Sequence, residues 1–494
     1  MVFSSISFLY FFLPVTLVVY YLIPRKWIGG KNAVLLVASL LFYFWGEQLL
    51  VIVMLVSAAT DYICSLVIEK YRHKKVIPKL MLAVSIITNI ALLGYFKYFG
   101  FFVENFSSLF GLNLNVVKIA LPIGISFYTF QTMSYTIDVY RGNLKAQNNP
   151  LTYATFVTMF PQLVAGPIVR YSEVEKELVS RRNTFADFSH GARRFIIGLS
   201  KKVLIANIFA ELARTIAASG ESTVLFAWMA GFAFFFQLYF DFSAYSDMAI
   251  GLGKMFGFKF PENFNYPYTA RSLADFWRRW HMTLTRWFKD YVYIPLGGNK
   301  GSKFKVIRNI LIIWLLTGFW HGAAWNFIAW GLYFALFMTA EKYIYGKHLK
   351  KIPRVFGHIY TIAVFFFGLV IFNADGLGES FANLAALFGC GGIPFAGLET
   401  WYYLRSYAVM FVIAVIGSTP LLKNLYGKAS GRAKSSGKVS APVLIGQAAP
   451  AALLQTKRAK ALNVIEPLFL AALLIITTAF LVDGSFNPFI YFRF

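Results

Sequence analysis

The chain has 494 residues, of which 58% are hydrophobic, 19% are aromatic and only 14% are charged. A soluble domain carries about 25% charged residues, so this composition excludes a protein that buries its apolar side chains in one water-soluble core and favours one that is solvated by lipid. The net charge of +25 comes from basic patches between apolar runs. These patches are typical of loops that set membrane topology and meet anionic lipid, not of a nucleic-acid-binding protein.

Long apolar runs along the chain predict an all-α polytopic integral membrane protein with about eleven transmembrane helices, because roughly 20 apolar residues cross a bilayer. The shorter runs indicate amphipathic or re-entrant helices. We expect residues 1–494 to form a single membrane domain. The runs are Phe8–Ile23, Ala33–Phe44, Leu80–Tyr95, Val224–Tyr239, Ile310–Met338, Val355–Phe372, Tyr407–Gly417 and Pro467–Val482.

The first apolar run has no positive charge before it and no small-x-small cleavage site after it. We therefore interpret this run as a membrane helix and not as a signal peptide. Arg25, Lys26 and Lys31 follow it. The positive-inside rule then places this loop in the cytoplasm and the N-terminus outside.

Residues 272–291 carry tryptophans and cations in an otherwise apolar chain. Ser272 and Asp275 predict a capping box at the start of a helix. Charged side chains, including Arg278 and Arg279, fall on the opposite helical face from the large apolar ones. We predict one continuous amphipathic helix that lies in the membrane interface. Its apolar face consists of Leu273, Phe276, Trp277, Trp280, Leu284, Trp287, Phe288 and Tyr291.

His281 lies on the border between the two faces of this predicted helix. One interpretation is an amphipathic side chain at the lipid–water boundary. The other is a titratable group at the mouth of a cavity, where Arg278 and Arg279 hold an anionic substrate, since arginine commonly binds phosphate.

A second histidine stands in a long apolar segment. Residues 309–340 contain no Asp, Glu, Lys or Arg and exceed one membrane span. Gly318, Gly322 and Gly331 offer places where this segment can break or pack closely. His321 follows Trp320, and Asn326 is five residues further on. An ionisable residue at membrane depth is costly, which favours a functional role over a packing histidine bonded to a carbonyl.

Burial keeps a histidine neutral, and a neutral imidazole can act as a general base. His321 could take a proton from an acceptor hydroxyl or thiol that attacks an activated acyl group such as a thioester, with Asn326 as a candidate oxyanion donor. A metal site is disfavoured because the chain has only six histidines and no Cys/His cluster. A Cys–His nucleophile stays open but weak, since we expect Cys64 and Cys390 to be buried packing residues.

The stretch 421–463 is rich in Gly, Ala, Ser and Lys, especially over residues 427–460. This composition predicts a basic, flexible linker before the last membrane helix.

Several motifs in a fixed order make the chain resemble the membrane-bound O-acyltransferase family. Within that family it is most similar to the membrane subunits of bacterial alginate O-acetyltransferases. The resemblance covers nearly the whole chain except the linker. The motifs are 122-PIGISFYTFQ-131, 159-MFPQLVAGPIVR-170, 237-QLYFDFSAYSDMAIGLGKMFGF-258, 263-NFNYPY-268, 275-DFWRRWHMTL-284, 293-YIPLGGN-299, 317-TGFWHGAAWNFIAWG-331 and 487-NPFIYFRF-494.

The resemblance implies a ring of membrane helices around a central funnel. It implies that His321 is catalytic and that His281 is a second functional residue on the cytoplasmic side. From their own positions in the sequence, and not from the resemblance, Arg278, Arg279, Trp320 and Asn326 are candidate substrate- or donor-binding residues. The resemblance further implies an acetyl donor, acetyl-CoA, with no bound cofactor, and a bacterial cytoplasmic membrane location. The acceptor is then an extracytoplasmic polysaccharide, reached through a partner acetyltransferase.

Two alternatives stay open. A sister branch transfers D-alanine to teichoic acid from a carrier protein. A transporter or flippase of an anionic lipid or sugar could use the same cations, with Asp138, Asp241 and Asp247 for proton coupling.

Overall fold

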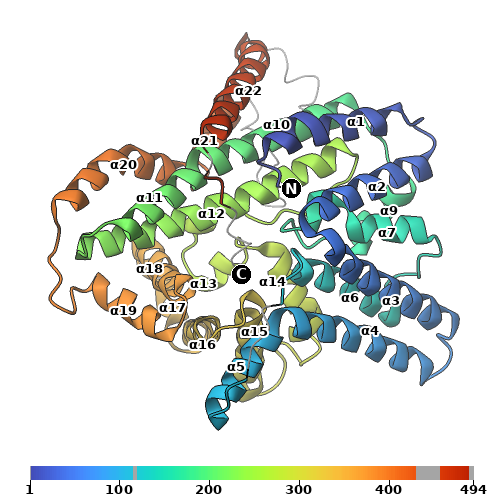
Figure 1. The fold of residues 1–494 in the computed structure, drawn as a ribbon, viewed down its shortest axis with the longest axis horizontal. Helices are drawn as coiled ribbons and strands as arrows, with labels where there is room; N and C mark the ends of the chain where they lie inside the picture. Colours follow the sequence, from blue (N-terminus) through green and yellow to red (C-terminus); the bar gives the residue numbers. More distant parts are fainter. Residues whose placement is uncertain (1, 115–118, 430–456, 485, 489–494) are drawn as a thin grey trace. The chain divides into compact units, whose positions relative to one another are not determined.

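A computed structural model describes residues 2–114, 119–429, 457–484 and 486–488 (Figure 1). Every regular element in these ranges is a helix, which confirms the predicted all-α class. The chain divides into two compact units. Unit 1 contains residues 1–189, 249–261 and 286–291, and unit 2 contains residues 190–248, 262–285 and 292–494.

Unit 1 is built from helices of the first 190 residues. Within it, α3 packs against α4 and α6, and α2 packs against α7. Its helices are α1 (Leu13–Leu22), α2 (Ile28–Glu47), α3 (Val51–Lys70), α4 (Ile77–Leu93), α5 (Phe99–Phe110), α6 (Ile125–Arg141), α7 (Pro150–Thr158), α8 (Phe160–Leu163) and α9 (Tyr171–Val179).

Unit 2 holds the later helices, in which α15 packs against α16, and α18 packs against both α16 and α19. Three helices, α10, α12 and α14, have residues in both units. The helices are α10 (Phe185–Lys201), α11 (Asn207–Ala218), α12 (Val224–Met255), α13 (Leu273–Trp277), α14 (Met282–Phe288), α15 (Lys303–His321), α16 (Trp325–Ala340), α17 (Gly346–Leu349), α18 (Arg354–Asn373), α19 (Leu377–Leu387), α20 (Leu398–Gly417), α21 (Leu421–Ala429) and α22 (Lys457–Asp483).

Short π and 3₁₀ segments extend or join several of these helices. The π segments are η1 (Phe8–Phe12), η3 (Gly94–Tyr98), η4 (Lys202–Ala206), η6 (Lys289–Tyr293) and η7 (Glu341–Tyr345). The 3₁₀ segments are η2 (Gln48–Leu50) and η5 (Pro267–Thr269).

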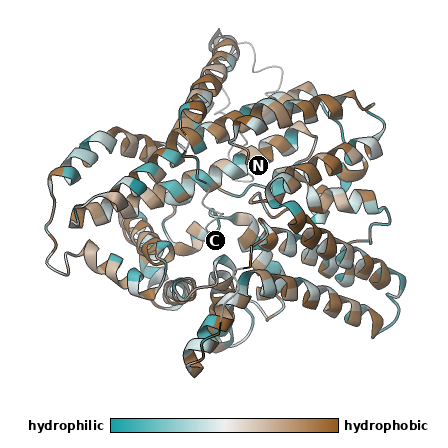
Figure 2. Ribbon diagram, viewed as in Figure 1, coloured by the Kyte–Doolittle hydropathy of each residue, from teal (hydrophilic) through white to brown (hydrophobic). Residues whose placement is uncertain are grey.

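Six helical stretches of the described chain are long and apolar enough to cross a membrane. Figure 2 shows such hydrophobic runs on α3 and α4. The helix Phe8–Leu22 is apolar but shorter. The structure therefore supports several membrane-crossing helices, and the count of about eleven stays a prediction. The six stretches are Ile28–Lys70, Ile77–Phe110, Val224–Met255, Arg354–Asn373, Leu398–Gly417 and Val464–Asp483.

The predicted continuous helix over residues 272–291 is wrong. The chain forms α13 and α14, with a break between Trp277 and Met282. The loop before the helices causes this break: the Asn265 backbone N–H donates to the Arg279 carbonyl at 2.9 Å, and the Met282 N–H donates to the Asn263 carbonyl at 2.9 Å. Of the predicted capping box, the N-cap bond is confirmed, because the Ser272 hydroxyl accepts a hydrogen bond from the Asp275 N–H at 3.1 Å. The Asp275 carboxylate instead accepts a hydrogen bond from Arg279 at 3.1 Å.

Of the predicted apolar side chains of this segment that belong to unit 2, Leu273, Phe276, Trp280 and Leu284 are nevertheless buried, and Trp277 is partly buried. Leu273 and Phe276 are fully buried, and Trp280 packs against Phe264 and Phe365 with ring centroids 5.1 Å away in both cases. Periodicity therefore identified the buried residues correctly although it missed the break.

In the stretch 421–463, residues Leu421–Ala429 form α21 and Lys457 begins α22. The rest of the predicted linker, residues 430–456, lies outside the described residues.

Candidate active site

His321 is the last residue of α15, at the predicted break in the apolar segment 309–340. The break is confirmed, because Gly322 is extended and α16 begins at Trp325. Glycine is required at position 322 since a Cβ there would collide with the ring of Phe327. His321 is half-buried at this helix end.

Glycine also sets the distance between α15 and α16. A Cβ on Gly318 would collide with the carbonyl of Phe327, and a Cβ on Gly331 would collide with the carbonyl of Trp314. This close approach confirms the expected role of these glycines as packing positions. It fixes the end of α15, and with it His321, against α16.

His281 occupies the break between α13 and α14 and is only 2% exposed. Its φ of +42° lies in the left-handed region, which non-glycine residues seldom adopt. Three non-glycine residues of the described chain have positive φ, and two of them, His281 and Tyr266, belong to this region of unit 2. Such a conformation costs of order 1–3 kcal/mol and is found where the surroundings impose it, often at functional sites.

Trp320 brings the two histidines together. Its ring centroid lies 4.9 Å from that of His321 and 6.0 Å from that of His281. Three further aromatic rings surround the pair: Phe242 lies 4.7 Å from His281, and Trp330 and Phe372 each lie 5.2 Å from His321. The two imidazoles therefore share an aromatic environment inside unit 2, in which His281 is buried and His321 is half-buried.

Asn263 is the hydrogen-bond partner of His281. Its side-chain oxygen Oδ1 lies 3.1 Å from Nδ1 of His281. The same oxygen accepts hydrogen bonds from the Thr283 hydroxyl at 2.9 Å and from the Thr283 N–H at 3.3 Å. The Nδ2 of Asn263 donates to the Ser246 hydroxyl on α12 at 3.0 Å. Asn263 itself is fully buried.

His281 lies outside the six candidate membrane spans. Burial lowers its pKa well below the ordinary value of 6.5, and the neighbouring His321 lowers it further. Removal from water disfavours the charged imidazolium. His281 is therefore neutral at physiological pH and can accept a proton.

The two candidate arginines differ in their surroundings. Arg278 is exposed. Arg279 is partly buried and forms an ion pair with Asp275, with Nε 3.1 Å from Oδ1. Arg278 is thus the better placed of the two to meet an anion from solution, while Arg279, in the break after α13, is tied to Asp275 of that helix.

Asn326 has contacts that do not suit an oxyanion donor. It is buried, and its Nδ2 donates to the carbonyls of Phe372 at 3.3 Å and Ala374 at 2.6 Å. Phe372 lies in the last turn of α18, and Ala374 is the residue that follows this helix. The geometry therefore favours a structural role for Asn326 as a cap on α18, in place of the expected stabilisation of an oxyanion.

The carboxylates considered for proton coupling are each paired within their own unit. Asp241 forms an ion pair with Lys202 at 2.9 Å, and both side chains are almost fully buried. Asp247 pairs with Lys201 at 2.8 Å and with Arg194 at 2.8 Å. In unit 1, Asp138 accepts a hydrogen bond from the Tyr291 hydroxyl at 2.6 Å.

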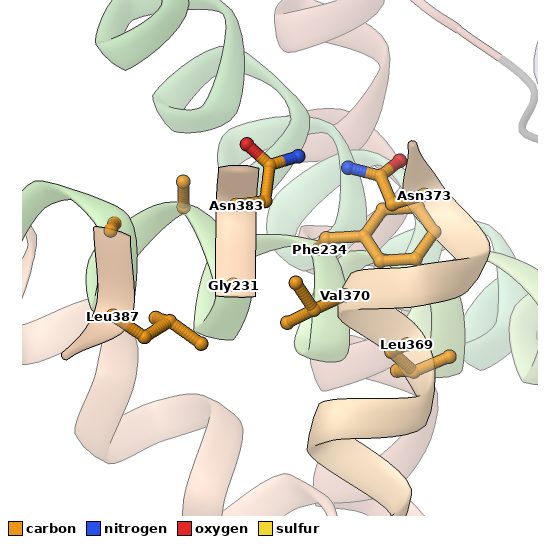
Figure 3. A pocket seen from close by; sticks show the side chains of 9 residues that line it. Gly231, Phe234, Leu369, Val370, Asn373, Asn383 and Leu387 are labelled. Carbon is orange, nitrogen blue, oxygen red and sulfur yellow. The ribbon is translucent and has the colours of Figure 1, made fainter. Parts of the chain in front are cut away.

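A cavity of about 470 Å³, including its open mouth, lies between α12, α18 and α19 of unit 2 (Figure 3). Its floor is apolar, and the amides of Asn373 and Asn383 stand over it (Figure 3). Asn373, which lines the cavity, directly follows Phe372, whose ring lies beside that of His321. The two histidines themselves do not line the cavity.

The two cysteines differ from each other. Cys64 is buried, as expected, but Cys390 is exposed, so the prediction of a buried packing role is wrong for Cys390. Within the described ranges, no group of three or more His, Cys, Asp or Glu side chains could hold a metal ion.

Sequence reasoning missed Asn263, Thr283 and Ser246, which hold His281. Asn263 opens the motif 263-NFNYPY-268, which in the sequence indicated only the family resemblance. No local pattern links this loop to His281, because the contact depends on the left-handed break after Trp280.

The chain is similar in sequence to several known proteins. The profile of the membrane-bound O-acyltransferase family matches residues 37–377. The "Probable alginate O-acetylase AlgI" of Azotobacter vinelandii is 37% identical over 510 aligned residues that cover 100% of both chains. The peptidoglycan O-acetyltransferase of Helicobacter pylori is 35% identical over 81% of this chain and 82% of its own. The teichoic acid D-alanyltransferase of Bacillus subtilis is 30% identical over 51% of this chain and 68% of its own.

Proposed function

This chain belongs to the membrane-bound O-acyltransferase family, and we propose that it transfers acetyl groups from acetyl-CoA in the cytoplasm to a polysaccharide hydroxyl on the other side of the membrane. The family and the relatives make the chain a multi-pass membrane O-acyltransferase. The acetyl group is favoured because the relatives that match most of the chain are named for O-acetyl transfer.

The observation that carries the proposal is the pair of imidazoles on either side of Trp320. In the proposed reaction the acceptor O–H proton passes to the imidazole of His321. The acceptor oxygen bonds to the acyl carbon, the carbon–sulfur bond breaks, and the thiolate leaves and takes up the proton. A positioned base of this kind contributes roughly 10²–10⁴-fold in rate.

The donor is proposed to approach near Arg278. Coenzyme A carries phosphates, and an exposed guanidinium binds phosphate through charge-assisted hydrogen bonds. The exposure of Arg278 supports its role over that of Arg279. In this orientation the N-terminus is outside, as the cations after the first apolar run indicate. A bacterial cytoplasmic membrane location and a partner acetyltransferase at the extracytoplasmic face complete the proposal.

D-alanyl transfer from a carrier protein is the second candidate, because a teichoic acid D-alanyltransferase matches about half of the chain. Acetyl transfer is preferred since the relatives named for it match far more of the chain.

Purified protein offered acetyl-CoA or a D-alanyl carrier protein separates these functions. The proposal predicts thiol release from acetyl-CoA and no stable complex with the carrier. Tight carrier binding with turnover of its D-alanyl thioester would replace acetyl transfer by D-alanyl transfer. Substrate movement across vesicles without turnover of either thioester would indicate a transporter.

A further inference from the structure

The amide of Asn263 has an orientation that its neighbours determine. The backbone N–H of Thr283 can only donate, and it points at Oδ1 from 3.3 Å. The atom at that position must therefore be the amide oxygen, because an NH₂ group could not accept the bond. The Ser246 hydroxyl on the other side then accepts from Nδ2 at 3.0 Å.

The orientation of Asn263 decides which nitrogen of His281 carries the proton. An amide oxygen is only an acceptor, so Nδ1 of His281, 3.1 Å away, must be the donor. A neutral imidazole has one N–H and one lone pair, and the hydrogen bond made by one nitrogen sets the state of the other. The lone pair of His281 is therefore on Nε2.

The loop that carries Asn263 is fixed to α12 at two successive residues. Asn263 donates to Ser246, and its neighbour Glu262 is joined to Asp247 through Arg194. The Arg194 guanidinium contacts both oxygens of Glu262, at 2.7 Å and 2.6 Å. These two attachments hold the amide against His281 in spite of the strained backbone there.

We propose that Asn263 is a positioning residue that holds His281 in the Nδ1–H tautomer, so that His281 enters the reaction as an acceptor at Nε2. This inference rests on the proposed acyl transfer, and it specifies that the second histidine acts as an acceptor and not as a donor. His281 accepts a proton or hydrogen bond from a hydroxyl, a thiol or a protonated imidazole. It does not donate an N–H to the acyl oxygen.

The tautomer can be measured without any reaction. Protein labelled with ¹⁵N-histidine is examined by magic-angle-spinning NMR in lipid, and His281→Gln identifies the His281 signals. We expect a protonated Nδ1 and an unprotonated Nε2 in the wild-type protein. A proton on Nε2 would overturn the proposal.

Variants of Asn263 connect the tautomer to the reaction. Asn263→Leu removes the acceptor at similar volume, and we expect mixed tautomers and a fall in kcat of about 10²-fold, the scale for misplacement of a reacting group, with the KM for acetyl-CoA unchanged. Asn263→Asp keeps an acceptor oxygen, so it should retain the Nδ1–H tautomer and recover part of the activity. Asn265→Leu, in the same loop, should behave like the wild type, because the bond that Asn265 makes to the Arg279 carbonyl comes from its backbone N–H and survives the change of side chain.

An Asn263→Leu protein that keeps both the tautomer and the kcat would contradict a positioning role. If this variant fails to fold, the wild-type spectrum and Asn263→Asp still decide, because an aspartate protein without the Nδ1–H tautomer contradicts the proposal. A wild-type protein that shows the tautomer but releases no thiol from any thioester would contradict the proposed function and not the tautomer assignment.

Discussion

The ring of His281 lies at an angle of 61° to the indole of Trp320, with centroids 6.0 Å apart. Trp320 immediately precedes His321, so the break after α13 and the end of α15 meet at one tryptophan. Two backbone irregularities produce this meeting: the left-handed conformation of His281 and the extended conformation of Gly322. The site therefore depends on where helices stop as much as on which residues they carry.

The two arginines beside His281 should contribute unequally to donor binding. Arg278→Ala removes an exposed cation and should raise the KM for acetyl-CoA by about 10-fold, as expected for a charge-assisted hydrogen bond worth about 1.5–3 kcal/mol. Arg279→Ala should have a smaller effect on KM because its guanidinium is held by Asp275. Steady-state kinetics over a range of donor concentration test this order. Equal effects, or an effect on kcat alone, would contradict donor binding by Arg278.

Removal of one partner of the buried ion pair between Lys202 and Asp241 should strongly destabilise the protein. Lys202→Met leaves Asp241 as a buried charge and should destabilise the protein by about 3–5 kcal/mol. Adding Asp241→Leu should recover most of this loss. Thermal unfolding in detergent measures both, with Glu211→Gln as the control, because the exposed Glu211–Arg214 pair should contribute at most about 1 kcal/mol. A double variant no more stable than Lys202→Met would show that the unpaired charge of Asp241 is not the cause of the lost stability.

The buried His281 predicts how stability changes with pH. Burial lowers the pKa of His281 in the folded state below 6.5, and the neighbouring His321 makes a smaller contribution in the same direction. Below about pH 6.5 the unfolded chain binds a proton that the folded chain does not, so the free energy of unfolding falls as pH drops from there through the folded-state pKa. Above about 6.5 both states are neutral and this contribution is constant. The Tm of the wild type should therefore fall more on acidification than the Tm of His281→Gln, and equal falls would contradict a depressed pKa.

The close approach of α15 and α16 should tolerate no added methyl group. Gly331→Ala places a Cβ against the carbonyl of Trp314 and should cost about 1–3 kcal/mol through overpacking. Because this contact fixes the end of α15, acyl transfer should fall as well. Gly378→Ala is the matched control, since open space surrounds that position in α19. Thermal unfolding and activity of the two variants check this, and a Gly331→Ala protein as stable as the control would contradict the packing role.

Much of the fold could be predicted from the sequence. Apolar runs identified the helical class, one of the three glycines predicted to break or pack residues 309–340 stands at the break after His321, and the spacing of Phe276 and Trp280 identified buried positions. These features are local, because hydrophobic periodicity and glycine sterics act over a few residues.

The features that sequence could not supply are long-range. The break at His281 arises because Asn263 and Asn265, earlier in the chain, bond the backbone that would otherwise continue the helix. The position of Asn326 near His321 in the sequence predicted a hydrogen-bond donor to an oxyanion. In the structure its Nδ2 instead donates to carbonyls at the end of α18. Contacts between separate helices decide both cases, and no local pattern encodes them.

The most direct test of the account is thiol release from acetyl-CoA by purified wild-type protein and by His321→Ala. We predict that release falls by about 10²–10⁴-fold in the variant while its elution and Tm stay those of the wild type. His348→Ala, which alters an exposed histidine of α17, should retain full release. A folded His321→Ala protein that releases thiol at the wild-type rate would contradict the central role of His321.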